Sequence, residues 1–425
     1  MDPFDVRLVF DPTATATALS FIFGGILLGT ISGLIPGLHA NNFALLLASV
    51  AVTMPGPPEY IAATMIAAGV VHSFLDIVPA LALGVPEADT LAATLPGHRL
   101  VLAGRGHEAL RLSAIGSALA VLAAIPLAVP VTMGMIAAYP LLREHISLVL
   151  GAIVVFLLLS ERTGRKRVGA ALGFLASGAL GWVALDVTPD APLDAGGMLA
   201  PLLAGLFGAP VLLAAFKGVG VPPQDPPSVV TPLRRLAGTA FAGSLAGAIV
   251  AYLPGISSAI AAVLALVALP GDAGASGVAV DDDGGARGFL VASSGVDTAN
   301  AVFALFALVA LGTPRTGVTV AMQDAGVPLN VPLLLVAVAI AGPVAAVLVV
   351  LIGDRYLTTI GRRDPAIVSV SVIGLLILLS YLFAGPVGLA AFAVATMIGL
   401  IPPAFGAQRV HLMGVLLGPL IVGQL

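Results

Sequence analysis

Apolar runs long enough to cross a lipid bilayer follow one another along this whole chain. A helix of about 20 apolar residues spans the hydrocarbon core of a membrane. Only 9% of the 425 residues are charged, whereas a soluble domain carries roughly a quarter. Apolar segments separated by Pro, Gly and charge clusters number about fourteen, near residues 17–35, 38–54, 61–83, 112–138, 146–160, 168–186, 198–216, 237–253, 257–269, 287–311, 331–351, 366–382, 384–401 and 409–424. The sequence therefore predicts an all-α polytopic membrane protein.

The placement of positive charge predicts how the chain is oriented. Cytoplasmic loops are enriched in Lys and Arg. If the proline-rich connector 217–236 is cytoplasmic and sides alternate outward from it, fifteen of the eighteen Lys and Arg residues fall inside. Only Arg7, Arg143 and Arg315 fall outside. Arg also far outnumbers Lys, which indicates a prokaryote. We expect a multi-pass protein of a prokaryotic cell (plasma) membrane, with its N-terminus outside.

The two halves of the chain repeat one another. Pro36-Gly37 and Pro254-Gly255 each interrupt an apolar run, and they lie 218 residues apart. The same shift places Gly25 and Gly29 on Gly243 and Gly247. These matched positions indicate an internal repeat.

Each half holds seven segments, and an odd number turns the second half upside down relative to the first. We therefore predict two inverted-topology repeats, 1–216 and 237–425, joined by the connector 217–236. Inverted repeats are the architecture of many secondary transporters.

The two Pro-Gly breaks predict broken, re-entrant helical hairpins with polar tips. Proline lacks an N–H, so each break is expected to free backbone carbonyls, near Ser32 and Val250. The helix that begins after each break points its first N–H groups at the tip, and such an end binds anions. The alternative is a pair of proline kinks buried in helix packing. The candidate substrate-binding residues are Pro36, Gly37, His39, Asn41, Asn42, Pro254, Gly255, Ser257 and Ser258.

Two further apolar segments carry acidic residues, which are rare inside membranes and usually line a substrate or ion path. Asp76 lies in the first segment, beside His72 and Ser73, and Asp297 lies in the second. The alternative is an interhelical hydrogen-bond clamp. The candidate ion-coupling residues are Asp76, Asp297, Thr298 and Asn300, with Na⁺ at Asp297 and Asn300 or a proton as the coupling ion. No other cofactor is expected, and the absence of Cys excludes thiolate metal sites.

Other functional classes find little support in the sequence. No GxSxG, HExxH or Walker pattern is convincing, so we predict that the chain is not an enzyme. No basic patch with interleaved aromatic residues indicates nucleic-acid binding. The acidic stretch 280–288 is expected to be a solvated loop.

Three segments resemble a known family. GTISGLIPGLHANNFALLLA (29–48) and AGAIVAYLPGISSAIAAVLA (246–265) resemble the two Pro-Gly signatures of the TctA family. GVDTANAVFALFALVALGTPRTG (295–317) is similar to its asparagine-containing segment. TctA proteins are the large permease subunits of tripartite tricarboxylate transporters. The resemblance implies transport of a small carboxylate.

The chain also departs from the family pattern. His39, Ala40, Asn41 and Asn42 replace the usual Gly-Pro-Thr, and Arg315 follows Pro314 where glycine is expected. This resembles an archaeal-type, standalone branch of the family. It stays open whether the chain works with the extracytoplasmic binding protein and the small membrane subunit, and whether it forms a homodimer.

Two functions compete at this point. The first is a secondary active, ion-coupled transporter (a symporter) of a di- or tricarboxylate-like anion, held by the two broken hairpins near the bilayer midplane. The alternative is a polyprenyl-phosphate translocase that holds a phosphate headgroup in the same hairpins. A passive channel is disfavoured, because a pore does not require a matched pair of broken helices.

Overall fold

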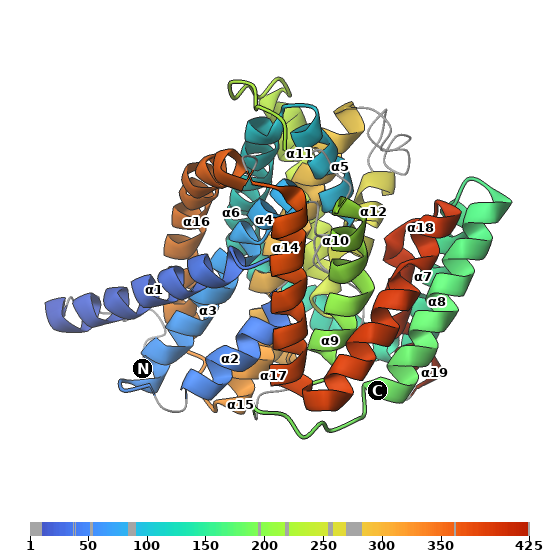
Figure 1. The fold of residues 1–425 in the computed structure, drawn as a ribbon. Coiled ribbons are helices and arrows are strands. Elements are labelled where there is room, and N and C mark those ends of the chain that lie inside the picture. The colour runs from blue at the N-terminus through green and yellow to red at the C-terminus, as the bar shows by residue number, and fades with distance from the viewer. Residues whose placement is uncertain are drawn as a thin grey trace.

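The fold is all-α in the computed structural model, which describes residues 11–36, 38, 40–51, 54–83, 91–193, 197–216, 221–253, 258–268, 283–360 and 363–423. No strand occurs in these residues, so the predicted fold class is confirmed. The helices (Figure 1) are α1 (Pro12–Gly33), α2 (Ala40–Ala51), α3 (Pro58–Leu75), α4 (Ile77–Leu83), α5 (Leu91–Leu102), α6 (Gly106–Glu144), α7 (Ile146–Ser160), α8 (Gly164–Ala184), α9 (Leu199–Leu203), the π-helical η1 (Ala204–Gly208), α10 (Ala209–Ala215), α11 (Leu233–Val250), α12 (Ser258–Ala268), α14 (Asp283–Leu311), α15 (Gly317–Asp324), α16 (Val331–Ile360), α17 (Pro365–Gly399), α18 (Ile401–Phe405), the 3₁₀-helical η2 (Arg409–Met413) and α19 (Gly414–Val422).

Each of the fourteen predicted segments overlaps a helix, but the described helices differ in length. Two of them, α2 with 12 residues and α12 with 11, are about 18 and 17 Å long, well short of a bilayer core of about 30 Å. Within the described residues, seven helical stretches are long and apolar enough to cross a membrane: Pro12–Gly33, Pro58–Leu83, Gly106–Glu144, Gly164–Ala184, Gly284–Leu311, Val331–Thr359 and Ala366–Phe405.

The helices pack in two groups, and each group draws on both halves of the sequence. In the first group α3 packs on α1 and α16, while α14 packs on α6 and α11. In the second group α17 packs on α9 and α10, while α8 packs on α18 and α19. Figure 1 shows α1, α3 and α16 at the left of the molecule and α7, α8, α18 and α19 at the right. Helices from the predicted repeat units 1–216 and 237–425 thus pack together in both groups, and the repeats and their inverted relation stay predictions.

Glycines bring two pairs of helices to backbone contact in the same way. A Cβ atom built on Gly25 or Gly29 of α1 would lie 2.3 or 2.4 Å from a backbone carbonyl oxygen of α3. A Cβ atom built on Gly243 or Gly247 of α11 would lie 2.4 or 2.3 Å from a carbonyl oxygen of α14. Small residues allow such close approach in membrane helices. The glycines matched in the sequence therefore make matched contacts.

A break divides α17 at Gly385, where φ is +57° and ψ is −153°. This left-handed conformation favours glycine. Pro386 follows, and its missing N–H leaves the carbonyl of Leu382 without its helical donor. The N–H of Leu193, in the loop after α8, donates to that carbonyl at 3.1 Å. The sequence placed a boundary here, between 366–382 and 384–401, and the break agrees with it.

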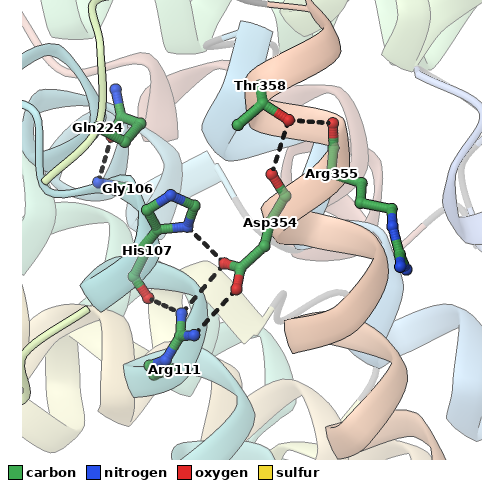
Figure 2. A network of polar contacts seen from close by, with 7 residues as sticks. All are labelled: Gly106, His107, Arg111, Gln224, Asp354, Arg355 and Thr358. Atoms are coloured by element: carbon green, nitrogen blue, oxygen red, sulfur yellow. Dashed lines mark hydrogen bonds and ion pairs between the residues drawn. The ribbon is translucent and has the colours of Figure 1, made fainter. Parts of the chain in front are cut away.

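The connector is attached to the ends of α5 and α6. Gln224 accepts a hydrogen bond from the N–H of Gly106 at 2.6 Å, and it donates to the carbonyl of Val101 at 3.1 Å. Close by, Asp354 of α16 receives hydrogen bonds from His107 and Arg111 of α6 (Figure 2). These contacts fix α5, α6 and α16 to one another at the end of the molecule that we predict to be cytoplasmic.

Candidate functional site

Both helices that approach a Pro-Gly pair end before it. Helix α1 ends at Gly33, and the N–H of Ile35 then donates to the carbonyl of Ser32 at 3.2 Å. Helix α11 ends at Val250, and the N–H of Leu253 donates to the carbonyl of Val250 at 2.9 Å. These turns correct one expectation. The carbonyls of Ser32 and Val250 are not free, because the chain tightens into a turn before each proline.

A new helix begins after each break, as predicted. Helix α2 begins at Ala40 and α12 begins at Ser258. Asn41 and Asn42 lie in the first turn of α2, and the structure describes only the backbone of these two residues. Pro36 lies in the turn that follows α1. The remaining predicted substrate residues, Gly37, His39, Pro254, Gly255 and Ser257, lie outside the described residues.

The second break is joined to α14 by a buried polar pair. The hydroxyl of Ser258, at the start of α12, donates to the carboxylate of Asp297 at 3.1 Å. Ser258 is fully buried and Asp297 is 8% exposed. The next residue, Thr298, is also buried, and its Oγ1 has no hydrogen-bond partner in the described part of the chain. Asn300, half-buried, lies one helical turn after Asp297. The structure thus brings a predicted substrate residue together with predicted ion-coupling residues.

The first break is joined to α3 by His72. Its Nδ1 lies 2.9 Å from the hydroxyl of Ser32, in the last turn of α1. Its ring stacks on Phe43 of α2, with centroids 5.2 Å apart and an angle of 8° between the planes. His72 is completely buried. One side chain therefore contacts the helix before the break and the helix after it.

Sequence reasoning noted His72 but did not place it among the site residues. The available signal was an ionisable side chain in an apolar helix. The partner Ser32 lies 40 residues away in the sequence, so only the packing of α1 on α3 identifies the contact.

Asp76 lies at the junction between α3 and α4, one turn after His72, and is 3% exposed. Pro79 explains the junction, since it has no N–H to donate to the carbonyl of Leu75 and its ring crowds that carbonyl. A buried carboxylate is costly unless it is paired or hydrogen-bonded. Asp76 is therefore a buried polar residue inside the helical bundle.

The helices that carry these groups are antiparallel. Gly97 of α5 packs against Leu81, at the end of α4, and lies near Leu290, at the start of α14. Beyond the other end of α14, Val318 packs against Gly69 of α3. Helix α14 therefore runs from the α4 end of α3 toward its beginning.

This arrangement places the two buried groups at a similar depth. His72 lies nine residues from Leu81, or about 14 Å, and Asp297 lies seven residues from Leu290, or about 11 Å. The site is therefore a pair of polar contacts, one at each break, inside an apolar bundle.

Long apolar helices, with two interruptions that have buried polar side chains beside them, define a class of protein: polytopic α-helical membrane proteins. The particular family follows from comparison with known proteins. The model of the tripartite tricarboxylate transporter TctA family matches residues 19–414. The chain therefore belongs to the TctA family, whose members are transporters, and it is a multi-pass membrane protein.

The chain is also similar to a curated archaeal protein. It is 27% identical to "Uncharacterized protein MJ1079" of Methanocaldococcus jannaschii over 351 residues, which are 81% of this chain and 82% of that protein. No solved structure matches the chain. The predicted family is thus confirmed, and neither comparison supports the polyprenyl-phosphate alternative.

Proposed function

We propose that this chain is a secondary active transporter that couples the uptake of a di- or tricarboxylate to an ion, across the plasma membrane of a prokaryote. Membership of the TctA family supports the tricarboxylate type of substrate. The observation that carries the finer proposal is the pair formed by Ser258, at the start of α12, and Asp297 on α14. It joins the end of a broken helix to a buried acid.

The carboxylate is held by the ends of α2 and α12. The first N–H groups of each helix have no partner within the helix and carry about half a positive charge. The hydroxyl of Ser258 is directed to Asp297, so the backbone N–H groups of α12 and the side chain of Ser257 take the carboxylate in this half. Asn41 and Asn42 take it in the other half.

The coupling ion follows from the charge of the site. A substrate with two or three negative charges enters a buried region that already holds Asp76 and Asp297. Negative charge is costly to bury in a medium of low dielectric, so we propose that a cation or proton enters with the substrate. Asp297, Thr298 and Asn300 form one candidate ion site, and Asp76 forms another.

The two helix groups offer a mechanism for alternating access. Both breaks lie in the group built on α3 and α14, which moves against the group that contains α8 and α17. This motion is proposed by analogy with other transporters built from repeats. The family works in a tripartite system, so an extracytoplasmic binding protein and a small membrane subunit are proposed partners.

Uptake by purified protein in proteoliposomes tests this function. We expect saturable uptake of labelled citrate or succinate, driven by a Na⁺ or proton gradient. Asn41→Ala and Ser257→Ala should each reduce uptake sharply. Ser244→Ala is the matched control, because Ser244 is buried but its hydroxyl donates to Ala240 of its own helix at 2.7 Å.

Three results would contradict the proposal. Wild-type rates in both site variants would remove the site assignment. No carboxylate uptake by the wild type would remove the proposed substrate class. Movement of a polyprenyl phosphate across the bilayer, without carboxylate uptake, would favour the alternative function.

A further inference from the structure

The ring of His72 makes a hydrogen bond through one of its two nitrogens. Its Nδ1 lies 2.9 Å from the hydroxyl of Ser32, and that hydroxyl also lies 3.2 Å from the carbonyl oxygen of Gly29. The hydroxyl has one hydrogen and can give it to either neighbour, so the contact is compatible with both neutral tautomers of His72. In each tautomer one ring nitrogen carries a hydrogen, and the other holds a lone pair that can bind a second proton.

From this geometry we propose that His72 binds the coupling proton, so that carboxylate transport by this chain is driven by protons rather than by Na⁺. The inference rests on the proposed function and specifies its coupling ion. A proton from water on one side binds the unprotonated ring nitrogen and gives an imidazolium. It returns to water on the other side, so that one proton crosses with each turnover and no other bond is made or broken.

The titratable residues closest to His72 are acidic, so a positive charge on its protonated ring is favoured. Asp76 lies one turn away on the same side of the membrane helix, and Asp297 of α14 lies at a similar depth. Helices α1, α2 and α4 contribute no titratable side chain. The other titratable residues on elements packed against α3 lie near helix ends: Glu59 and Tyr60 on α3 itself, Asp283 and Arg287 on α14, Asp324 on α15, Asp354, Arg355 and Tyr356 on α16, and His107, Glu108, Arg111, Tyr139, Arg143 and Glu144 on α6.

Protonation of His72 would change its interactions with the helices on both sides of the first break. The ring contacts Ser32 at the end of α1 and Phe43 in α2. A new positive charge at this point attracts the substrate carboxylate to the nearby start of α2. It also strengthens the stacking, since an aromatic face attracts a cation. A Na⁺ ion would not use this site, because hard cations prefer oxygen ligands over imidazole nitrogen.

Proton movement in Na⁺-free proteoliposomes tests this inference. With a pH-sensitive dye trapped inside, adding citrate or succinate to the wild type should acidify the lumen, and an imposed pH gradient should drive accumulation. His72→Gln keeps an amide that can donate to Ser32 but cannot take up a proton. We expect it to lose both lumenal acidification and gradient-driven accumulation, while exchange of labelled for unlabelled substrate is retained in part.

Ser73→Ala is the matched control. It is the next residue on α3, and its hydroxyl donates to Val70 of the same helix at 2.9 Å. This variant should acidify the lumen like the wild type. A His72 side chain with a purely structural role would lower exchange and accumulation equally, and that result would overturn the inference.

The wild type alone also tests the inference, whether or not the variant folds. Carboxylate uptake that requires Na⁺ and moves no protons would overturn it and leave the proposed function standing. An absence of any carboxylate uptake would instead refute the proposed function.

Discussion

Replacing Gly29 by alanine tests the close packing of α1 on α3. A Cβ atom at this position would lie 2.4 Å from the carbonyl oxygen of Ala68 and 2.9 Å from the Cβ atom of Val71. Real Cβ contacts are essentially never shorter than 3.0 Å. The nearest neighbour is backbone, which cannot rotate away as a flexible side chain would. The two helices must therefore move apart.

Two effects of opposite sign determine the change in stability. Alanine is favoured over glycine in a helix interior by about 1 kcal/mol. Overpacking against a fixed neighbour costs about 1–3 kcal/mol. Gly24→Ala on the same helix separates the two effects, because a Cβ at Gly24 meets nothing within 4 Å. Since the helix preference is common to both variants, their difference should equal the steric cost, about 1–3 kcal/mol.

Thermal unfolding of the purified variants in one detergent measures this difference. Gly24→Ala should unfold at or above the wild-type temperature, and Gly29→Ala should unfold below it. Gly247→Ala, with a Cβ 2.3 Å from the carbonyl oxygen of Val296, should behave like Gly29→Ala. Equal unfolding temperatures for Gly24→Ala and Gly29→Ala would refute the argument that backbone contact at Gly29 holds α1 on α3.

Three further predictions concern buried polar groups. Burial alone would raise the pKa of Glu161, but the hydrogen bond from His411 and the N–H of Gln408 outweigh it and lower the pKa. The resulting stabilisation is complete above the unfolded-state pKa of about 4.5 and is lost as the pH falls through the lower folded pKa. Glu161→Gln should therefore unfold at a lower temperature than the wild type in thermal scans at pH 7. This difference in unfolding temperature should disappear in acid. Tyr252→Phe removes a 2.6 Å hydrogen bond with Thr132 and should cost about 1 kcal/mol, measured by the same scans; an unchanged unfolding temperature would show that the bond contributes nothing. Glu108→Ala leaves two arginines without their buried acid and should cost about 3 kcal/mol, seen as a lower yield of folded protein; wild-type yield and unfolding temperature would contradict this.

Much of the helical architecture could be predicted from the sequence, because apolar length and Pro-Gly interruptions act locally. The start of α14 could not. Residues 280–288 were expected to form a loop, yet α14 begins at Asp283. Arg287, one turn after this start, donates to Glu108 of α6 at 2.8 Å. A partner 179 residues away stabilises the turn, and no local pattern could reveal it.

The candidate site was predictable in its residue types and not in its contacts. Asp297 and Ser258 were both named from sequence, but their hydrogen bond joins residues 39 positions apart. The carbonyl of Ser32 was expected to be free because Pro36 removes its helical donor. That prediction was wrong because Ile35 supplies another donor within the turn. His72 shows the same limit, since its role depends on α1 packing beside α3.

The hydrogen bond from Leu193 to Leu382 constrains how this protein can evolve. Surface loops usually tolerate changes in length. The loop after α8 does not have that freedom at Leu193, because its backbone completes a helix made almost two hundred residues later. Lengthening or shortening the loop would withdraw the donor and leave a polar carbonyl exposed inside an apolar bundle. We expect homologous chains that keep Gly385-Pro386 to keep the length of this loop as well, whatever residues it contains.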